Sequence, residues 1–305
     1  MLDALRIATV LVGGLMAISS AWSMGACPPV GWTPAALSQL KVAQWSVSNP
    51  KHREELALAL LPCLADPDPQ LRDGIAFEAL SFWLRQKQMS VDAQRSIFSA
   101  LLKQLEANSL DEGGFAAPFA VLTLAEIARA DRVTPFLGDS GRNILVNTAT
   151  QYMRGVYDYR GFVEGQGWRH GVAHGADLLM QLALNPAIDK AQLESLVEAA
   201  LMQVVPAAGH FYIYGESERL ARPILVAARR GLIDAEWWRR SLTRLGEPRP
   251  FAAWDQAFGS QAGLARLHNT KAFVLVLYAN VRDNTHEGLR DALLAPVREV
   301  LEKLP

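Results

Sequence analysis

The chain has 305 residues, of which 50% are hydrophobic and 20% charged, and its 30 Lys and Arg against 31 Asp and Glu give a net charge of −1. Because the two signs are mixed along the chain, it has no basic segment of the kind that binds nucleic acid. Beyond the N-terminus, no apolar run reaches the roughly 18 residues of a membrane span. The sequence therefore predicts no nucleic-acid partner and no transmembrane span in the mature chain.

The first 26 residues have the pattern of a signal peptide. A short, weakly basic start ends at Arg6 and is followed by the apolar segment 7–21, which has the length of an h-region. Small residues come next, so that cleavage after Ser23 or after Ala26 would fit the pattern. We expect residues 1–26 to be removed and residues 27–305 to form a periplasmic or secreted domain. An uncut N-terminal anchor and a cytoplasmic protein are the alternatives.

The two cysteines, Cys27 and Cys63, agree with export because an oxidising compartment could join them. Closing a loop of about 37 residues would stabilise the fold by roughly 4 kcal/mol in the chain-entropy estimate. Two other readings stay open. The segment Met24-Gly-Ala-Cys27 resembles a bacterial lipobox, which would make Cys27 the site of a lipid anchor, and both cysteines could instead be buried thiols.

From residue 33 onward the apolar spacing is helical almost everywhere. Thr33 and Pro34 look like an N-cap and an N1 proline that start a helix through about Gln44. Pro and Asp turns then separate a series of helices. We expect them at 50–65, 70–86, 90–106, 116–130, 140–155, 168–184, 190–204, 218–230, 235–245, 264–278 and 287–304.

Residues 56–84 resemble a HEAT-type repeat, in which one helix ends at an Asp-containing turn and an Arg lies early in the next helix. Those positions would be Asp66 and Arg72. Short turns join the later helices in the same way, and stacked helix pairs bury a continuous core. The sequence therefore predicts an all-α fold of stacked antiparallel helix pairs, a HEAT/ARM-like α-α superhelix in a single elongated domain.

Two segments, 155–167 and 207–217, interrupt the helical pattern with glycines and aromatic residues. Just after the first, His170, His174 and Asp177 follow at i, i+4 and i+7, which on one helix places all three side chains on one face. That spacing could hold a divalent metal, as in zincins, although the zincin glutamate is replaced by Gly171. A metal-free site and a buried structural network are the alternatives.

Gly171 and Gly175 each cost about 1 kcal/mol relative to Ala inside a helix. Either a closely packed neighbouring helix or a ligand against bare backbone would offset this cost. Other polar and aromatic residues could converge on the same place, with Glu216 or Glu164 as a general base and His210 as a third metal ligand. The candidate binding residues are Asp158, Arg160, Glu164, Trp168, Tyr214, Glu218, Arg219, Asn269 and Lys271, the last two at the start of a helix.

Three runs together resemble one bacterial family, domain-of-unknown-function family 2785. They are RGFVEGQGWRHGVAHGADLL (160–179), GESERLA (215–221) and NTKAFVLVLY (269–278), and LRDGIAFEALSFWL (71–84) fits its N-terminal part. The resemblance implies a helical body and favours a meeting of these separated segments at one site. It implies no activity.

Two functions remain in competition. The first is a binding or scaffold protein of the cell envelope that holds a protein, peptide or glycan. The second is a hydrolase built on His170, His174 and Asp177, with a divalent metal as an option. The sequence has no serine-nucleophile elbow, phosphate loop, dinucleotide fingerprint or CxxC pair, so we expect the binding protein.

Overall fold

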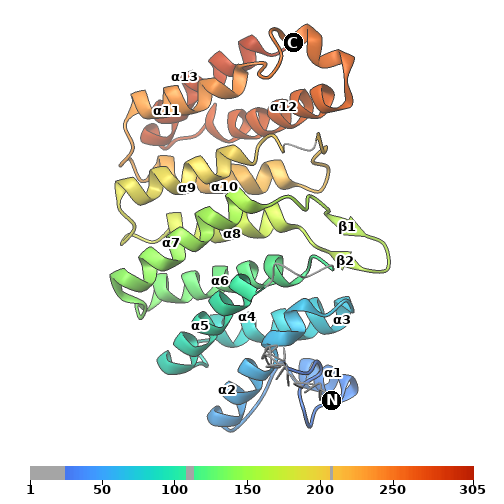
Figure 1. Cartoon of the computed structure of the whole chain (residues 1–305). Helices are drawn as coiled ribbons and strands as arrows, with labels where there is room; N and C mark the ends of the chain where they lie inside the picture. Colours follow the sequence, from blue (N-terminus) through green and yellow to red (C-terminus); the bar gives the residue numbers. More distant parts are fainter. Residues whose placement is uncertain (1–24, 108–112, 207–208) are drawn as a thin grey trace, which may run out of the picture.

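The computed structural model describes residues 25–107, 113–206 and 209–305, which form a stack of helices (Figure 1). The predicted signal peptide 1–26 therefore lies almost wholly outside the described residues. The α-helices are α1 Pro34–Val42, α2 Pro50–Ala59, α3 Pro69–Leu71, α4 Glu78–Arg85, α5 Val91–Ala107, α6 Ala116–Val133, α7 Gly138–Gly155, α8 Gly171–Ala183, α9 Lys190–Met202, α10 Glu216–Arg229, α11 Ala235–Thr243, α12 Gln261–Val281 and α13 Glu287–Lys303. The all-α prediction is confirmed.

Shorter elements complete the fold. One antiparallel hairpin pairs the two-residue strands β1 Phe162–Val163 and β2 Gly167–Trp168. The 3₁₀ and π segments are η1 Leu61–Ala65, η2 Arg72–Phe77, η3 Arg244–Gly246 and η4 Trp254–Gly259.

Two predicted helices are divided in the structure. The helix expected at 50–65 ends at Ala59 and continues as the 3₁₀ segment η1, because Pro62 lacks the N–H of an α-helical turn and its ring opposes the carbonyl four residues earlier. The helix expected at 70–86 is interrupted by the π segment η2. Among the predicted caps, Thr33 is confirmed, since its hydroxyl accepts a hydrogen bond from the N–H of Ala36 at 3.1 Å.

The helices pack as pairs that follow one another up the stack (Figure 1). Helices α4, α6, α8, α10 and α12 pack in that order into one layer, and α5, α7 and α9 pair with α6, α8 and α10 from the other side. Because each pair repeats the same path, loops of one kind gather along one edge of the stack.

The two edges of the stack carry different loops. The hairpin edge, on the right in Figure 1, holds the segments between α7 and α8, α9 and α10, and α11 and α12 (156–170, 203–215 and 244–260). The turn edge, on the left, holds the short connections between α6 and α7, α8 and α9, and α10 and α11 (134–137, 184–189 and 230–234).

One apolar core runs through the stack, with the large side chains Trp83, Trp238 and Phe273 fully enclosed. At its N-terminal end, Cys27 and Cys63 form a disulfide with a Cα–Cα distance of 5.1 Å. The predicted pairing of the two cysteines is confirmed, and the described part of the chain has no free thiol.

None of the described helices is both long enough and apolar enough to cross a membrane.

Candidate functional site

The two histidines of the HGVAHGAD segment lie close together, with ring centroids 5.8 Å apart, but they do not lie on one helix, which corrects the sequence prediction. Helix α8 begins at Gly171, and His170 precedes it as the N-cap with φ 56° and ψ 35°, in the left-handed region. Trp168, also expected on this helix, lies in strand β2. His, like Asn and Asp, adopts left-handed geometry more often than other non-glycine residues do, but such geometry is uncommon even for these types, so the residue type alone did not predict the conformation of His170.

His170 is held against the loop that precedes α10. Its ring stacks on the indole of Trp168 at a centroid distance of 4.6 Å, and its Nε2 lies 3.1 Å from the carbonyl oxygen of Tyr214. The carboxylate of Glu216 is 3.8 Å away, beyond hydrogen-bond reach. Burial, with a smaller contribution from the charge of Arg219, lowers the pKa of His170 to about 4. The ring is therefore neutral at pH 7.

His174 lies one turn into α8 and is more deeply enclosed. Its ring meets Phe119 edge-on at 5.1 Å, and its Nδ1 is buried without a hydrogen-bond partner among the described residues. Burial first, and the charges of His170 and Arg219 next, lower its pKa to about 3. His174 is consequently a neutral imidazole with one unused ring nitrogen.

The glycines of this segment are explained by packing. A Cβ on Gly175 would lie 2.2 Å from the sulfur of Met153, and one on Gly171 would lie 3.1 Å from the hydroxyl of Tyr152. Both neighbours belong to α7. Of the two explanations left open by the sequence, the structure selects close approach of a neighbouring helix.

Asp177 is committed to two arginines of α10. Arg219 donates a hydrogen bond to one of its carboxylate oxygens, and Arg222 lies 3.6 Å from the other. Burial raises the pKa of Asp177 against the opposing effect of these arginines. Among the described residues, no group of three His, Cys, Asp or Glu side chains is placed to hold a metal ion, so the predicted metal set of His170, His174 and Asp177 stays a prediction.

The two irregular segments singled out in the sequence do meet. The Tyr214 hydroxyl donates to the carbonyl of Phe162 at 3.3 Å, and the Tyr214 ring lies so close to Gly161 that a Cβ there would be 2.0 Å from it. Nearby, the rings of Tyr159 and His210 stack at 6.0 Å. The loop before α8 and the loop before α10 thus form one continuous surface.

Asn269 holds the loop before α10 by two hydrogen bonds. It is fully buried inside α12, where its side-chain oxygen accepts from the N–H of Tyr212 at 2.9 Å and its amide donates to the carbonyl of His210 at 2.8 Å. The expectation that Asn269 and Lys271 start a helix is wrong, since α12 begins at Gln261. Lys271 is exposed and its amine donates to the carbonyl of the C-terminal Pro305, so it lies apart from the site.

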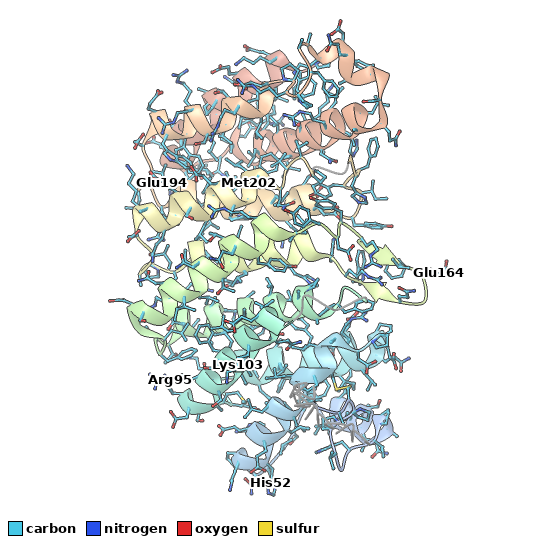
Figure 2. The ribbon with its side chains drawn as sticks, in the orientation of Figure 1. His52, Arg95, Lys103, Glu164, Glu194 and Met202 are labelled. Atoms are coloured by element: carbon cyan, nitrogen blue, oxygen red, sulfur yellow. A yellow bond between two sulfur atoms is a disulfide. The ribbon has the colours of Figure 1, made fainter. Side chains whose placement is uncertain are left out.

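The remaining predicted residues divide by position. Asp158 and Arg160 pair with each other in the first loop, and Glu216 is buried at the start of α10, where it accepts from the N–H of Tyr214 at 2.9 Å. Glu218 is exposed in the first turn of α10. Glu164 lies at the outer tip of the hairpin (Figure 2) and does not join the histidines.

Two arginines outside the predicted site, Arg72 and Arg169, hold the hairpin in place. Arg72 is fully buried in η2, donates to the carbonyls of Asp66 at 2.9 Å and Gln166 at 2.9 Å, and lies over the ring of Phe115 at 3.9 Å. Arg169 donates to the side chain of Gln166 at 2.7 Å. Arg72 thus contacts Asp66, the residue with which the sequence paired it. Its bond to Gln166, 94 positions later, left no local pattern in the sequence.

Exposed aromatic side chains are confined to one side of the molecule. In the described part of the chain these are Tyr157, Phe162, Trp168 and Phe258, and all four lie on the hairpin edge. Ile213, 67% exposed, lies between them in the loop before α10. The large hydrophobic side chains that the described turn edge exposes are aliphatic, namely Leu184 and Leu232, with Val133 at the adjoining end of α6.

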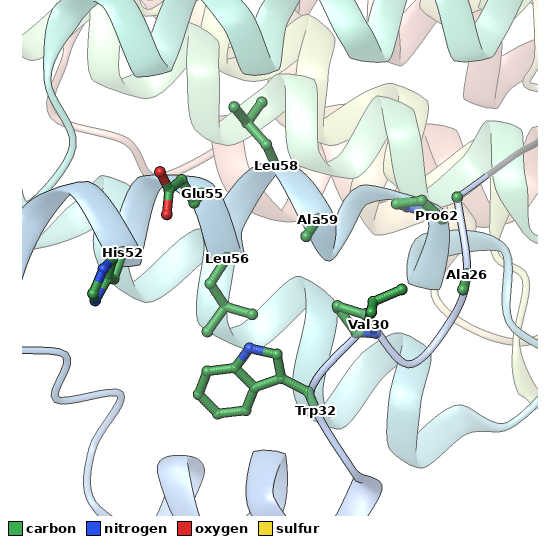
Figure 3. A pocket seen from close by; sticks show the side chains of 11 residues that line it. Ala26, Val30, Trp32, His52, Glu55, Leu56, Leu58, Ala59 and Pro62 are labelled. Atoms are coloured by element: carbon green, nitrogen blue, oxygen red, sulfur yellow. The ribbon is translucent and has the colours of Figure 1, made fainter.

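An apolar pocket of about 630 Å³ lies at the N-terminal end of the stack (Figure 3). Val30, Trp32 and Leu56 line it, with His52 and Glu55 on its rim. None of the predicted site residues reaches it, so it is separate from the hairpin edge.

Comparison with known proteins gives one match. The sequence model of a family described as "Protein of unknown function (DUF2785)" matches residues 101–279. This range contains both irregular loops, α8, α10 and most of α12, but not residues 71–84, which also resembled the family. No curated protein and no solved structure matches the chain.

Proposed function

The chain belongs to the DUF2785 family of proteins of unknown function, and from this premise we propose that it is an exported binding protein of the cell envelope that holds a protein or peptide partner along its hairpin edge. The observation that carries the proposal is the confinement of exposed Tyr157, Phe162, Trp168 and Phe258 to that edge. Exposed aromatic side chains that gather on one face mark interaction sites more often than singly scattered ones do.

The geometry of the edge supports a binding role in a second way. Trp168 is stacked on His170 and meets Tyr214 edge-on at 5.6 Å, so its indole is already ordered. A partner that packs against it therefore loses little side-chain entropy on binding. Both charge signs occur in or next to the segments that carry the aromatic residues, since Arg154, Arg160, Glu164 and Glu218 are exposed, which suits a polar and aromatic protein partner.

Export is the other half of the proposal. It is supported by the signal-like pattern of residues 1–26 and by the Cys27–Cys63 disulfide, since such bonds persist in oxidising compartments. Mass spectrometry of the protein from its own cells, with and without reduction, tests it. A mature chain cleaved near residue 24 or 27 with the disulfide intact supports export, and a reduced chain that retains residues 1–26 contradicts it.

The partner is tested by photo-crosslinking in the cells that make the protein. A photoreactive amino acid replaces Phe162 in one variant and Leu232 in the other, because the two side chains are 43% and 45% exposed on opposite edges. We expect a discrete crosslinked protein from position 162, absent from position 232 and lost when Trp168→Ala is added. Equal crosslinking from both edges, or none from either, contradicts the proposal.

A hydrolase is the second candidate, and one observation favours it: the neutral His174, with its unused Nδ1, lies within the same helix as Asp177. Its pKa of about 3 makes it a weak base, so in a hydrolase its ring would orient the substrate or the attacking water by a hydrogen bond. His174→Gln separates the two functions. Loss of hydrolysis in a panel of ester and amide substrates, with crosslinking from position 162 unchanged, would identify a hydrolase.

A further inference from the structure

A polar cavity of about 340 Å³ lies between α4, α6, α8 and α10, and none of the four exposed aromatic residues lines it. Its polar lining consists of His174, Gln181 and four charged side chains. The charged ones are Arg85, Glu126, Asp177 and Arg219. Its apolar lining consists of Phe77, Leu122, Ala125 and Met180. A concave site with apolar walls and a few convergent polar groups is the usual form of a small-molecule site.

The four charges form two ion pairs that each join different helices. Arg85 of α4 donates to both carboxylate oxygens of Glu126 of α6, at 2.8 and 2.5 Å. Arg219 of α10 pairs with Asp177 of α8. Two guanidinium groups and two carboxylates therefore face one space, and their formal charges cancel.

Each pair leaves hydrogen-bonding capacity unused. Arg219 makes its hydrogen bond through Nη1, which leaves Nε and Nη2 without a partner in the described parts of the chain. Arg85 uses Nε and Nη2, which leaves Nη1. A guanidinium carries five N–H donors and a carboxylate about four acceptor positions, so a ligand can add bonds without breaking either pair.

His174 adds a neutral side chain to the cavity wall. It is 7% exposed, and its Nδ1 is enclosed so fully that a ligand in the cavity does not reach that atom. A hydrogen bond to the backbone of Pro118 acts to raise its pKa, but burial outweighs this and keeps the imidazole neutral. His174 therefore leaves the balance of the four charges unchanged.

We propose that this cavity binds a small zwitterion of the α-amino-acid class. Its carboxylate accepts hydrogen bonds from the free N–H groups of Arg219 and Arg85, and its ammonium donates to Asp177 and Glu126. An aliphatic side chain packs on Phe77, Leu122 and Met180. The lining charges cancel, so a ligand with a single charge would leave one charge uncompensated in a half-enclosed site, whereas a zwitterion adds none.

Three probes that share one carbon skeleton test the ligand class by isothermal titration calorimetry on the mature, disulfide-bonded protein. L-leucine carries both charges, 4-methylpentanoate lacks the ammonium group, and 3-methylbutylamine lacks the carboxylate. We expect L-leucine to bind and each single-charge probe to bind at least about tenfold more weakly. Failure of L-leucine to bind at millimolar concentration, or equal binding of either single-charge probe, overturns the proposal.

Two matched substitutions place the binding in the cavity. Leu122→Trp fills it from a half-buried position on α6, and Leu275→Trp adds the same ring to an exposed position on α12. We expect the first to abolish L-leucine binding and the second to leave it unchanged, with urea midpoints that confirm both folds. Binding that survives Leu122→Trp in a folded protein overturns the assignment, and crosslinking at the hairpin edge is unaffected by either outcome.

Discussion

The two edges of the helix stack connect the same kind of helix pair and are built differently. On the turn edge, the carboxylate of Asp131 accepts hydrogen bonds from the N–H groups of Phe136 and Leu137, each at 2.8 Å. It also accepts from the side chains of Arg142 at 2.7 Å and Asn185 at 3.2 Å. One buried carboxylate thus joins the end of α6, the start of α7 and the loop after α8.

Arg230 continues this network to the next pair. It donates to the carbonyls of Ala183, Asn185, Pro186 and Ile188, at 2.7 to 3.3 Å. These bonds satisfy carbonyl groups that a helix end and a turn would otherwise leave open. Short connections and satisfied backbone groups make the turn edge a structural support.

The hairpin edge has longer loops and a different use of its side chains. Its polar groups fix the loops from inside, as Arg72 and Asn269 do, while Tyr157, Phe162, Trp168 and Phe258 remain exposed. Loops held by a rigid body are the common place for binding residues. The backbone and polar groups of the turn edge thus bond to one another, whereas the hairpin edge leaves ordered aromatic side chains exposed to a partner.

The largest expected effect comes from breaking the turn edge. Asp131→Ala leaves Arg142 and two backbone N–H groups without their buried acceptor, and we expect the free energy of unfolding to fall by about 3–5 kcal/mol. Urea denaturation followed by circular dichroism measures the loss. Asp139→Ala is the matched control, because Asp139 also pairs with Arg142 but is 97% exposed. A similar loss in both variants would mean that the buried network does not support the edge.

The next effect comes from separating the two loops of the hairpin edge. Gly161→Ala would place a methyl group 2.0 Å from the Tyr214 ring, so the ring must move away and its hydroxyl must leave Phe162. We expect a loss of about 1–3 kcal/mol from this overpacking, together with faster amide exchange in residues 209–215. Gly155→Ala is the control, since nothing lies within 4 Å of that position, and an equal loss there would contradict the contact.

The sequence predicted the helices of the stack well and their interruptions poorly. The helices expected at 116–130, 140–155 and 190–204 appear within a few residues as α6, α7 and α9, because long periodic segments carry a strong local signal. The π segment at Arg72 was missed. Its side chain is held by the carbonyl of Gln166 and the ring of Phe115, which are tertiary contacts that periodicity does not contain.

The candidate site was predicted in outline only. The sequence identified the two loops that meet, and the structure places Tyr214 against Phe162 and His170. It gave the wrong geometry for His170, because a helical spacing was assumed through a residue that adopts a left-handed conformation. Glu126 was missed, since an ion pair with Arg85 across 41 residues leaves no local pattern.

Acid should weaken the hairpin edge before the turn edge. The pKa of His174 is about 3 in the folded state against 6.5 ordinarily, mainly through burial, with His170, Arg219 and Arg72 as the charges that add to it. Protonation therefore favours the unfolded chain, so this contribution to stability is complete above about pH 6.5 and declines as the pH falls. At pH 5.5 the expected loss is about 1.4 kcal/mol from His174, and His170, whose pKa is lowered to about 4, adds a similar amount.

Asp131 on the turn edge behaves in the opposite sense. Burial acts to raise its pKa, but the hydrogen bonds from Arg142 and two backbone amides outweigh this and lower it. Its contribution is thus retained until the pH falls below the ordinary carboxyl value of 3.8. Hydrogen exchange at pH 7 and pH 5.5, corrected for intrinsic rates, should show lost protection in α8 near His174 and none at residues 134–137. His174→Gln should remove about half of this pH dependence, because His170, whose pKa is also lowered to about 4, supplies the rest. If the dependence persists when His170→Gln is added, the acid sensitivity lies elsewhere.

The smallest expected effect on stability is the sharpest test of what the hairpin edge is for. Phe258 and Leu232 are 57% and 45% exposed on opposite edges, so truncation of either to alanine should change the free energy of unfolding by no more than about 0.5 kcal/mol. Binding should separate them, because Phe258 is an exposed aromatic residue of the hairpin edge and lies in a different loop from Tyr157, Phe162 and Trp168. We expect the crosslinking yield from position 162 to fall in Phe258→Ala and to stay at the wild-type level in Leu232→Ala. An unchanged yield in both variants would confine the partner to the hairpin and the loop before α10, and an equal fall in both would remove the functional distinction between the edges.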